Sequence, residues 1–259
     1  MRSRRGFLAS LGAGGAALGF GLGSIIRGHA CDAPRTAAGA DTGAVAGAVA
    51  GVVAGAVAGA VIEGEPTPLE DLMIEHAVLE RVLLIYEAGI RRLATPHGEL
   101  DPAVIARAGG IIRRYIEDHH ERDEEQHVFP RLERVGVELA LIQTLRTQHA
   151  AGRRLTSEVI DRATAAGVRD PDGRARLAAA MQRFLWMYRP HAARETTVLF
   201  PAFRKAVPQA EYDQLRVTLE RSERATLGAH VFDTMMSEVC ALEAALGIGD
   251  LDAFTPEMP

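Results

Sequence analysis

The sequence predicts an all-α fold, an up-down-up-down antiparallel four-helix bundle with an additional C-terminal helix. Apolar residues recur at spacings of three and four along several long segments, which places them on one face of a helix. The breaks between these segments are short and carry Pro, Gly or helix-capping residues, so consecutive helices are expected to lie antiparallel. The two halves of the predicted bundle also resemble each other, because each pairs a helix bearing one central His with a helix bearing His-x-x-x-Glu.

Length and composition limit the class of protein to which this chain can belong. The chain has 259 residues, enough for one or two domains, and 47% of them are hydrophobic, which is ample for a core. The net charge of −5 and the absence of a basic stripe give no sign of nucleic-acid binding. We therefore expect a globular protein that does not bind nucleic acid.

Residues 1–30 have the form of a twin-arginine export signal. Arg4 and Arg5 precede Phe7 and Leu8, an apolar run follows to residue 26, and residues 28–30 form a small-residue cleavage site. The alternative is a generic basic start before a hydrophobic segment. The signal predicts an exported protein in the periplasm or cell envelope, and cleavage after Ala30 would leave Cys31 first, which opens a lipid-anchor option.

Residues 31–65 form a low-complexity segment rich in Ala, Gly and Val. Residues 43–62 carry no charge and are long enough to cross a bilayer. Their frequent glycines each cost a helix about 1 kcal/mol relative to Ala. A flexible tether is therefore the preferred interpretation, with a membrane association through this segment left open.

The predicted bundle spans residues 66–207. Its first helix begins at a capping box formed by Thr67, Pro68 and Glu70, and His76 lies in the middle of its apolar stripe. Asp101 and Pro102 begin the second helix. A single His on such a stripe is more often a hydrogen-bonded core residue than a ligand, so His76 alone decides nothing.

The second half repeats this arrangement. Gly136 marks a turn, and the third helix carries His149 centrally on its apolar face. Asp170 and Pro171 begin the fourth helix. Pro208 then begins a further helical pattern to about residue 246, within a C-terminal region of residues 208–259.

The second and fourth helices carry nearly the same motif. Each has His, three residues, Glu, four residues and then Phe-Pro, and the two copies lie 71 positions apart. Residues four apart share a helix face, so each copy points an imidazole and a carboxylate the same way. The four predicted helices then bring six polar residues together at one level of the core: His76, His120, Glu124, His149, His191 and Glu195.

These six residues predict a metal site. Burying each group unpaired would cost roughly 2–7 kcal/mol, against a stability margin of about 5–15 kcal/mol. Mutual His–Glu pairing is the alternative, but it does not explain a His at the same depth on all four helices. Two ions do, each with two His and with both Glu bridging, about 3.5–4 Å apart. Imidazole with carboxylate suits iron, manganese or zinc.

Residues 69–203 resemble a hemerythrin-like (HHE cation-binding) domain through these six residues and the two Phe-Pro endings. The resemblance implies a four-helix bundle around two non-haem iron ions, and the C-terminal tail is similar to an extension of some exported bacterial members. Oxygen-carrying members have a second His where this chain has Arg153, and a carboxylate where it has Thr196. The four-His, two-Glu set is more similar to di-iron proteins of iron–sulfur cluster repair, which carry an additional Cys-containing region that is missing here.

The leading functional prediction is a di-iron protein that binds or senses O2, NO or peroxide at the cell envelope. The alternative is a di-iron oxidoreductase that detoxifies peroxide or NO or acts in iron–sulfur repair, with Tyr86, Tyr115 and Tyr188 as candidate redox-active neighbours. A purely structural bundle with buried His–Glu pairs is the third option. No organic substrate is indicated.

Overall fold

A computed structural model describes residues 66–95, 98–228 and 231–257 of the chain. Within these ranges the secondary structure is helical throughout, with no strand, which confirms the predicted all-α class. The predicted export signal and tether, residues 1–65, lie outside the described residues. No helix among the described residues is long and apolar enough to span a membrane.

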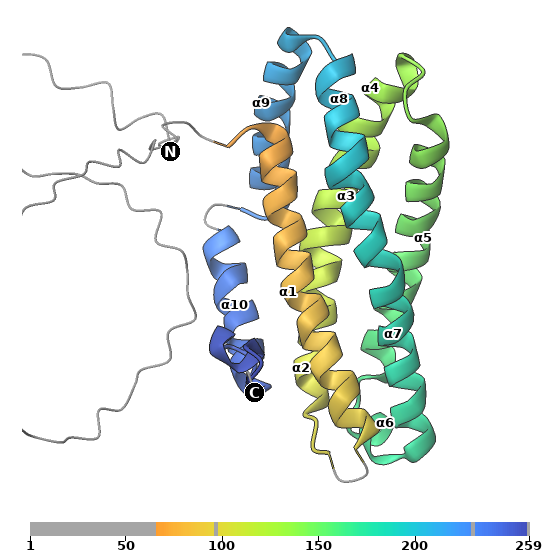
Figure 1. Ribbon diagram of the computed structural model, residues 1–259, viewed down its shortest axis with the longest axis vertical. Coiled ribbons are helices and arrows are strands. Elements are labelled where there is room, and N and C mark those ends of the chain that lie inside the picture. The colour runs from red at the N-terminus through yellow and green to blue at the C-terminus, as the bar shows by residue number, and fades with distance from the viewer. Residues whose placement is uncertain (1–65, 96–97, 229–230, 258–259) are drawn as a thin grey trace, which may run out of the picture. The chain divides into compact units, whose positions relative to one another are not determined.

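Four helical rods form the bundle (Figure 1). The first is α1 (Pro68–Ala94) and the third is α5 (Leu139–Arg162). The second runs over residues 102–134, through α2 (Pro102–Ile111), α3 (Glu121–Asp123) and α4 (Phe129–Arg134). The short α6 (Ala165–Arg169) leads into the fourth rod, α7 (Pro171–Arg194) and α8 (Phe200–Ala206). α1 and α5 each pack against both α2 and α7, so successive rods are antiparallel neighbours.

Side-chain caps begin three of the rods where the sequence predicts them. Thr67 Oγ1 accepts a hydrogen bond from the Glu70 backbone N–H at 3.3 Å, and the Glu70 carboxylate accepts from the Thr67 N–H at 2.7 Å. Asp101 accepts from the N–H of Ala103, and Asp170 from that of Gly173. These bonds satisfy donors that the first turn of a helix leaves unpaired, so the rods begin in the predicted register.

Both copies of the repeated motif contain a π-helical turn. Such segments cover Glu124–Val128 and Glu195–Leu199, and a third covers Ile112–His120. The N–H of Phe129 donates to the Glu124 carbonyl and that of Phe200 to the Glu195 carbonyl, each five residues back. The following proline has no N–H to place. The Phe-Pro ending therefore closes a wide turn that begins on each motif's Glu, and such turns are frequent at functional sites.

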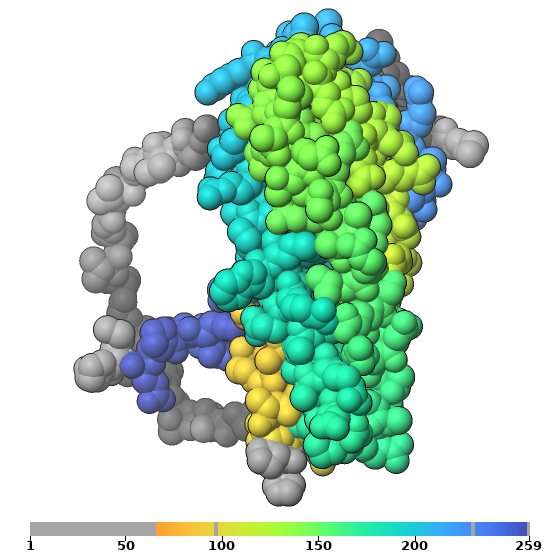
Figure 2. Space-filling view, turned by 90° about the vertical axis from the view of Figure 1, so that its right-hand side faces the viewer, coloured from red at the N-terminus to blue at the C-terminus, as the bar shows by residue number. Residues whose placement is uncertain are grey.

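The apolar core is divided into two clusters. One contains the C-terminal part of α1 with α2, α7 and the C-terminal helix α10 (Val231–Ala245), and Tyr86, Ile105 and Phe184 are among its residues. The other contains the start of α1 with α4, α8 and α9 (Gln209–Thr226), and includes Phe129 and Phe200. Between them lies a layer of buried polar residues. α5 and α7 pack side by side and occupy much of the face that Figure 2 turns to the viewer.

The C-terminal region differs from the expectation of one additional helix. Among the described residues it contains α9 (Gln209–Thr226) and α10 (Val231–Ala245), followed by a 3₁₀ turn at Leu251–Phe254. Gly228 follows α9 with a φ of +88°, a left-handed conformation that favours glycine and ends a helix. Both helices pack against α1, and an ion pair joins Arg81 on α1 to Glu243 on α10.

Candidate metal centre

The structure brings all six predicted site residues together. They come from the four bundle rods: His76 from α1, His149 from α5, His191 from α7, and the others from the π-helical segments. His76 is 9% exposed and the other five are at most 4% exposed. The site therefore lies inside the bundle and away from bulk water.

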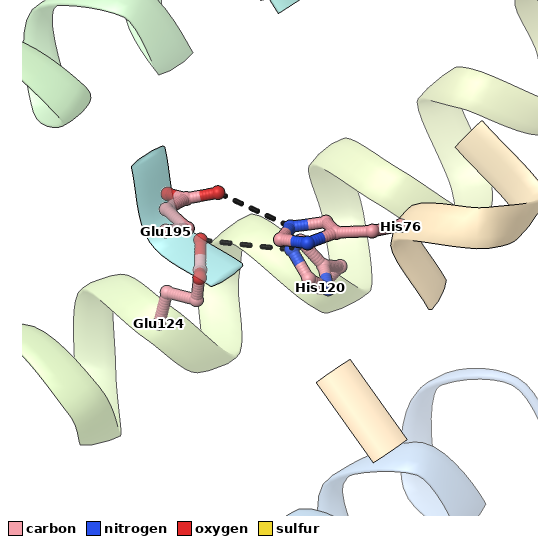
Figure 3. A group of neighbouring side chains, drawn as sticks. All are labelled: His76, His120, Glu124 and Glu195. Carbon is pink, nitrogen blue, oxygen red and sulfur yellow. Dashed lines mark hydrogen bonds and ion pairs between the residues drawn. The ribbon is translucent and has the colours of Figure 1, made fainter. Parts of the chain in front are cut away.

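One half of the site contains His76, His120, Glu124 and Glu195, with one ligand atom of each within 4.8 Å of the others (Figure 3). The His76 Nε2 lies 3.1 Å from Glu195 Oε2, and the His120 Nε2 lies 3.7 Å from Glu124 Oε2. The two Nε2 atoms are 3.1 Å apart. Two imidazole nitrogens and two carboxylates from three rods thus face one point.

The other half is built from His149, His191 and the same Glu195. Its two Nε2 atoms are 3.3 Å apart, and Glu195 Oε1 lies 3.1 Å from that of His191. The His149 Nε2 is also 3.5 Å from Glu124 Oε2. Glu124 and Glu195 therefore each contact histidines of both halves, which is the position that bridging carboxylates require.

The Nδ1 atom of each of the four histidines lies within hydrogen-bond distance of a residue outside the six-residue cluster. Carboxylates accept from two of them and an amide oxygen from a third, so these rings carry a proton on Nδ1 and turn the Nε2 atom inward. The Nδ1 pairs and their separations are His120–Glu75 at 2.7 Å, His149–Glu125 at 2.9 Å, His191–Gln148 at 2.9 Å and His76–Thr196 at 2.9 Å.

The outer partners follow the same internal symmetry as the ligands. In each half, the residue before the single His, Glu75 or Gln148, accepts from the His of the repeated motif. The residue after each motif's Glu, Glu125 or Thr196, pairs with the single His of the other half. The aromatic packing is exchanged in the same way. Phe200 stacks on the His76 ring and Phe129 on the His149 ring, each with centroids 5.6 Å apart.

The donor set fits metal ions better than it fits protein-only pairing. Both oxygens of Glu124 and both of Glu195 are buried and have no hydrogen-bond partner among the described residues. A buried polar group left unsatisfied costs about 1–3 kcal/mol, and more when charged. Inward-facing Nε2 lone pairs 3.1–3.3 Å apart also repel unless a proton or a cation lies between them. Bound cations would satisfy these Nε2 atoms and the carboxylate oxygens together.

The protonation of the cluster reflects the same crowding. Burial, followed by the nearby Glu195 carboxylate, raises the pKa of Glu124 well above its ordinary value. Burial also acts to raise the pKa of Glu195, but His191, His149 and His76 outweigh it and hold that pKa well below the usual range. The pKa of His149 is raised to about 9 because Glu125 and Glu195 outweigh its burial. Metal binding here must therefore displace protons.

A third set of neighbouring donors does not form a separate metal site. Glu121, Glu125 and His149 place donor atoms close together. However, the Nη2 of Arg153 lies 3.0 Å from Glu121 Oε2 and 2.9 Å from Glu125 Oε1. The guanidinium already supplies the positive charge that a cation would bring, so the donor atoms are paired.

The sequence pattern misses the outer partners and misplaces two neighbours of the motif. On an ideal helix His119 and Asp123 point about 100° away from the ligand face, toward the rim or surface, but they are only 3% and 2% exposed. The reason is that α9 covers this face of the helix. Its Ser222 Oγ donates a hydrogen bond to Asp123 Oδ1 at 2.6 Å. The His119 Nε2 reaches Glu75 Oε1 at 3.1 Å, so Glu75 joins two histidines. Each outer partner directly precedes or follows a predicted ligand, but that position alone does not distinguish it from a surface residue.

Comparison with known families agrees with this geometry. The profile of the Hemerythrin HHE cation binding domain matches residues 67–203, with a second, overlapping match over 140–225. The chain belongs to this family. The first match covers nearly all of the bundle and contains all six site residues, so the hemerythrin-type bundle and a cation-binding role apply to this chain.

Curated relatives of this hemerythrin-like chain come from mycobacteria. Uncharacterised proteins of Mycobacterium bovis and of two Mycobacterium tuberculosis strains are each 44% identical over 190 residues, which is 73% of this chain and 74% of the relative. No solved structure gives a significant match to the chain. At Arg153, where oxygen-carrying hemerythrins have a second His, this hemerythrin-like chain forms ion pairs with Glu121 and Glu125.

Proposed function

We propose that this hemerythrin-like protein holds two non-haem iron ions and uses them to bind or sense O2, NO or peroxide. The observation that carries the proposal is the set of four inward-facing Nε2 atoms around two carboxylates that both halves share. Each half supplies two imidazoles, and Glu124 and Glu195 serve both, which suits two ions. Such a donor set also suits manganese or zinc, and the family resemblance favours iron.

The chain's own residues prepare the site for such ions. Two iron ions in this set would supply reversible binding of, or electron transfer to, a small diatomic or peroxide ligand. The carboxylates of Glu75 and Glu125 accept from His120 and His149, which fixes these rings and raises their basicity as ligands. Phe129 and Phe200 stack on two of the rings and exclude water from that side. The result is a preorganised, dry site that only a small ligand can enter.

The cell envelope is the proposed location of this activity. The supporting observation is the sequence of residues 1–65, with paired arginines, an apolar run and a small-residue tether. Twin-arginine export carries folded proteins, which suits a metal site assembled before export. Fractionation of cells that express the intact chain, compared with an Arg4→Lys, Arg5→Lys double variant, tests this part. Export that persists in the double variant would contradict the twin-arginine route.

The central experiment is metal content with an optical spectrum. Full-length protein is loaded anaerobically with Fe²⁺, desalted and assayed for iron, then exposed separately to O2, NO and peroxide. We expect two irons per chain and a spectrum that changes with at least one of the three ligands. His191→Ala should lower the bound iron, whereas the control His127→Ala, on a half-buried His outside the cluster, should retain it. Protein that retains no transition metal after reconstitution would overturn the proposal.

A di-iron oxidoreductase is the second candidate. It is favoured by acid groups buried beside the ligands, because the Tyr188 hydroxyl donates to Glu121 next to His120. Turnover of peroxide or NO needs protons and electrons as well as a binding site, and such groups can carry them. Steady-state consumption of peroxide or NO that disappears in Glu124→Ala and Glu195→Ala would support this activity. Binding without turnover leaves the sensing function.

A further inference from the structure

Tyr188 lies beside the metal site without being one of its ligands. It is 1% exposed and sits on α7, three residues before His191. Its ring meets that of His191 edge-on, with centroids 5.4 Å apart. Its hydroxyl donates to Glu121 Oε1 at 2.5 Å. One aromatic side chain thus contacts a proposed ligand through its ring and a carboxylate through its hydroxyl.

The surrounding chain is shaped to hold that hydroxyl. A Cβ at residue 152 on α5 would lie 1.9 Å from Tyr188 Oη, so glycine is required there for the phenol to fit. Phe184 stacks on the other side of the ring, with centroids 4.3 Å apart. Arg153 Nη2 lies 3.0 Å from Glu121 Oε2 and holds the carboxylate in place. Residues of α3, α5 and α7 therefore fix the hydrogen bond between Tyr188 and Glu121.

Neither of the other two candidate tyrosines has this combination. Tyr86 is fully buried, but its hydroxyl has no hydrogen-bond partner among the described residues. Tyr115 meets the His119 ring at 5.8 Å, and His119 is not one of the six site residues. Tyr86 does continue the aromatic contact away from the site, since its ring lies 5.5 Å from that of Phe184. Of these three tyrosines, Tyr188 is therefore the one placed to exchange an electron with the proposed metal centre.

We propose that Tyr188 is a one-electron donor to the metal centre and that Glu121 accepts its phenolic proton. The inference rests on the proposed function, because it needs iron at the site. The ring contact with His191 provides a short route for the electron, and the existing hydrogen bond provides the route for the proton. Loss of both leaves a neutral tyrosyl radical, so no charge is left on the buried phenol.

The step balances when a peroxide is the oxidant. Hydrogen peroxide takes up two electrons and two protons from solvent, its O–O bond breaks, and two waters form. Iron held by the six site residues in a one-ferrous, one-ferric state would supply one of the two electrons. Tyr188 supplies the second electron, and its O–H proton passes to Glu121. The tyrosine thereby completes a two-electron reduction that the irons alone would leave one electron short.

The test is electron paramagnetic resonance on rapidly frozen, iron-loaded full-length protein. Partly reduced protein is mixed with hydrogen peroxide, once with ordinary tyrosine and once with ring-deuterated tyrosine incorporated. We expect a radical whose hyperfine pattern narrows on deuteration. Tyr188→Phe should lose this signal at unchanged iron content, and Glu121→Gln should weaken it because the amide is a poor proton acceptor. Tyr212→Phe, on α9 against Phe203, is the matched control and should keep it.

The outcomes separate this inference from the function on which it rests. If peroxide leaves the optical spectrum of the iron-loaded protein unchanged, the proposed ligand chemistry fails. If the spectrum changes but no deuterium-sensitive radical forms, or the radical persists in Tyr188→Phe, the role of Tyr188 is refuted while the site stands. The deuterated wild-type protein remains informative even if the Tyr188→Phe chain does not fold, because a signal that deuteration leaves unchanged is not on tyrosine.

Discussion

The substitution Glu124→Gln tests the metal site through stability. Glu124 is fully buried, and burial followed by the nearby Glu195 carboxylate raises its pKa, which favours the protonated carboxyl in the metal-free protein. A folded-state pKa above the unfolded one gives stability that is present below the unfolded pKa and is lost as pH rises through the folded pKa. Gln has the shape of the protonated acid. We therefore expect Glu124→Gln to change the stability of the metal-free protein by less than about 1 kcal/mol, far below the roughly 2–5 kcal/mol of a typical core truncation.

The iron-loaded protein should behave differently. One ion at a free concentration one hundred times its Kd stabilises the folded state by about 2.7 kcal/mol, so two ions contribute roughly 5 kcal/mol. At about 2–4 °C per kcal/mol for a domain of this size, iron should raise the Tm by roughly 10–20 °C. Glu124 lies near histidines of both halves. Its loss as an anionic ligand should therefore remove most of this rise.

Thermal unfolding with and without Fe²⁺ under anaerobic conditions measures both quantities. Glu133→Gln is the matched control, because this glutamate lies on the same rod but pairs with Arg146 at the surface. The control should keep the full metal-dependent rise. An equal rise in Glu124→Gln and wild type would refute a bridging role for this carboxylate. A strong loss of stability in the metal-free variant would refute the argument that Gln replaces a protonated acid.

Three further predictions follow from individual contacts. Gly152→Ala places a methyl group against the Tyr188 hydroxyl and two of its ring carbons, at 1.9, 2.7 and 2.9 Å, and should cost about 1–3 kcal/mol in urea unfolding. Adding Tyr188→Phe should leave much of this loss in place because the ring carbons still clash, and an unchanged urea midpoint in Gly152→Ala would contradict the contact. Burial first, and then nearby Glu121, raises the pKa of Glu117 from 4.5 to about 7. Wild-type stability should therefore fall by roughly 3 kcal/mol from this group as pH rises through that window, and Glu117→Gln should flatten the profile. Ser222→Ala removes the hydrogen bond that α9 donates to a buried carboxylate and should cost about 1.5–3 kcal/mol; an unchanged urea midpoint would show that α9 is not held there.

The bundle and the meeting of the six site residues could be predicted because both depend on local geometry. Spacings of three and four place side chains on one face of a helix, and caps such as Thr67 and Asp170 mark where the rods begin. Short connections then leave little freedom in how the rods pack. A polar residue in the middle of an otherwise apolar stripe, such as His149, is accordingly predicted to face the core, and it is fully buried.

The outer partners could not be predicted because they depend on contacts between rods. Glu75 and Gln148 lie one position from a site residue, an offset that on an isolated helix points away from the ligand face. They reach the neighbouring rod's His only because the packed helices bring it alongside. The π-helical turns at Glu124 and Glu195 likewise lie outside the ideal 3.6-residue geometry that the pattern assumes. The burial of His119 depends on α9, whose packing position the bundle pattern does not specify.

The two halves of the bundle agree in residue type at the six site residues but not at the partners of the histidine Nδ1 atoms, and the internal symmetry explains this difference. The inner set is identical in both halves, two histidines and one glutamate each, as the proposed binding of two equivalent ions would require. The outer set repeats in position and not in type, since Glu75 corresponds to Gln148 and Glu125 to Thr196. The only requirement there is an oxygen that accepts from Nδ1. Each half ends with one histidine bonded to a carboxylate and one bonded to a neutral oxygen. The two halves of the site are thus matched in overall charge. The carboxylate partner belongs to the motif histidine, His120, in one half and to the single histidine, His149, in the other.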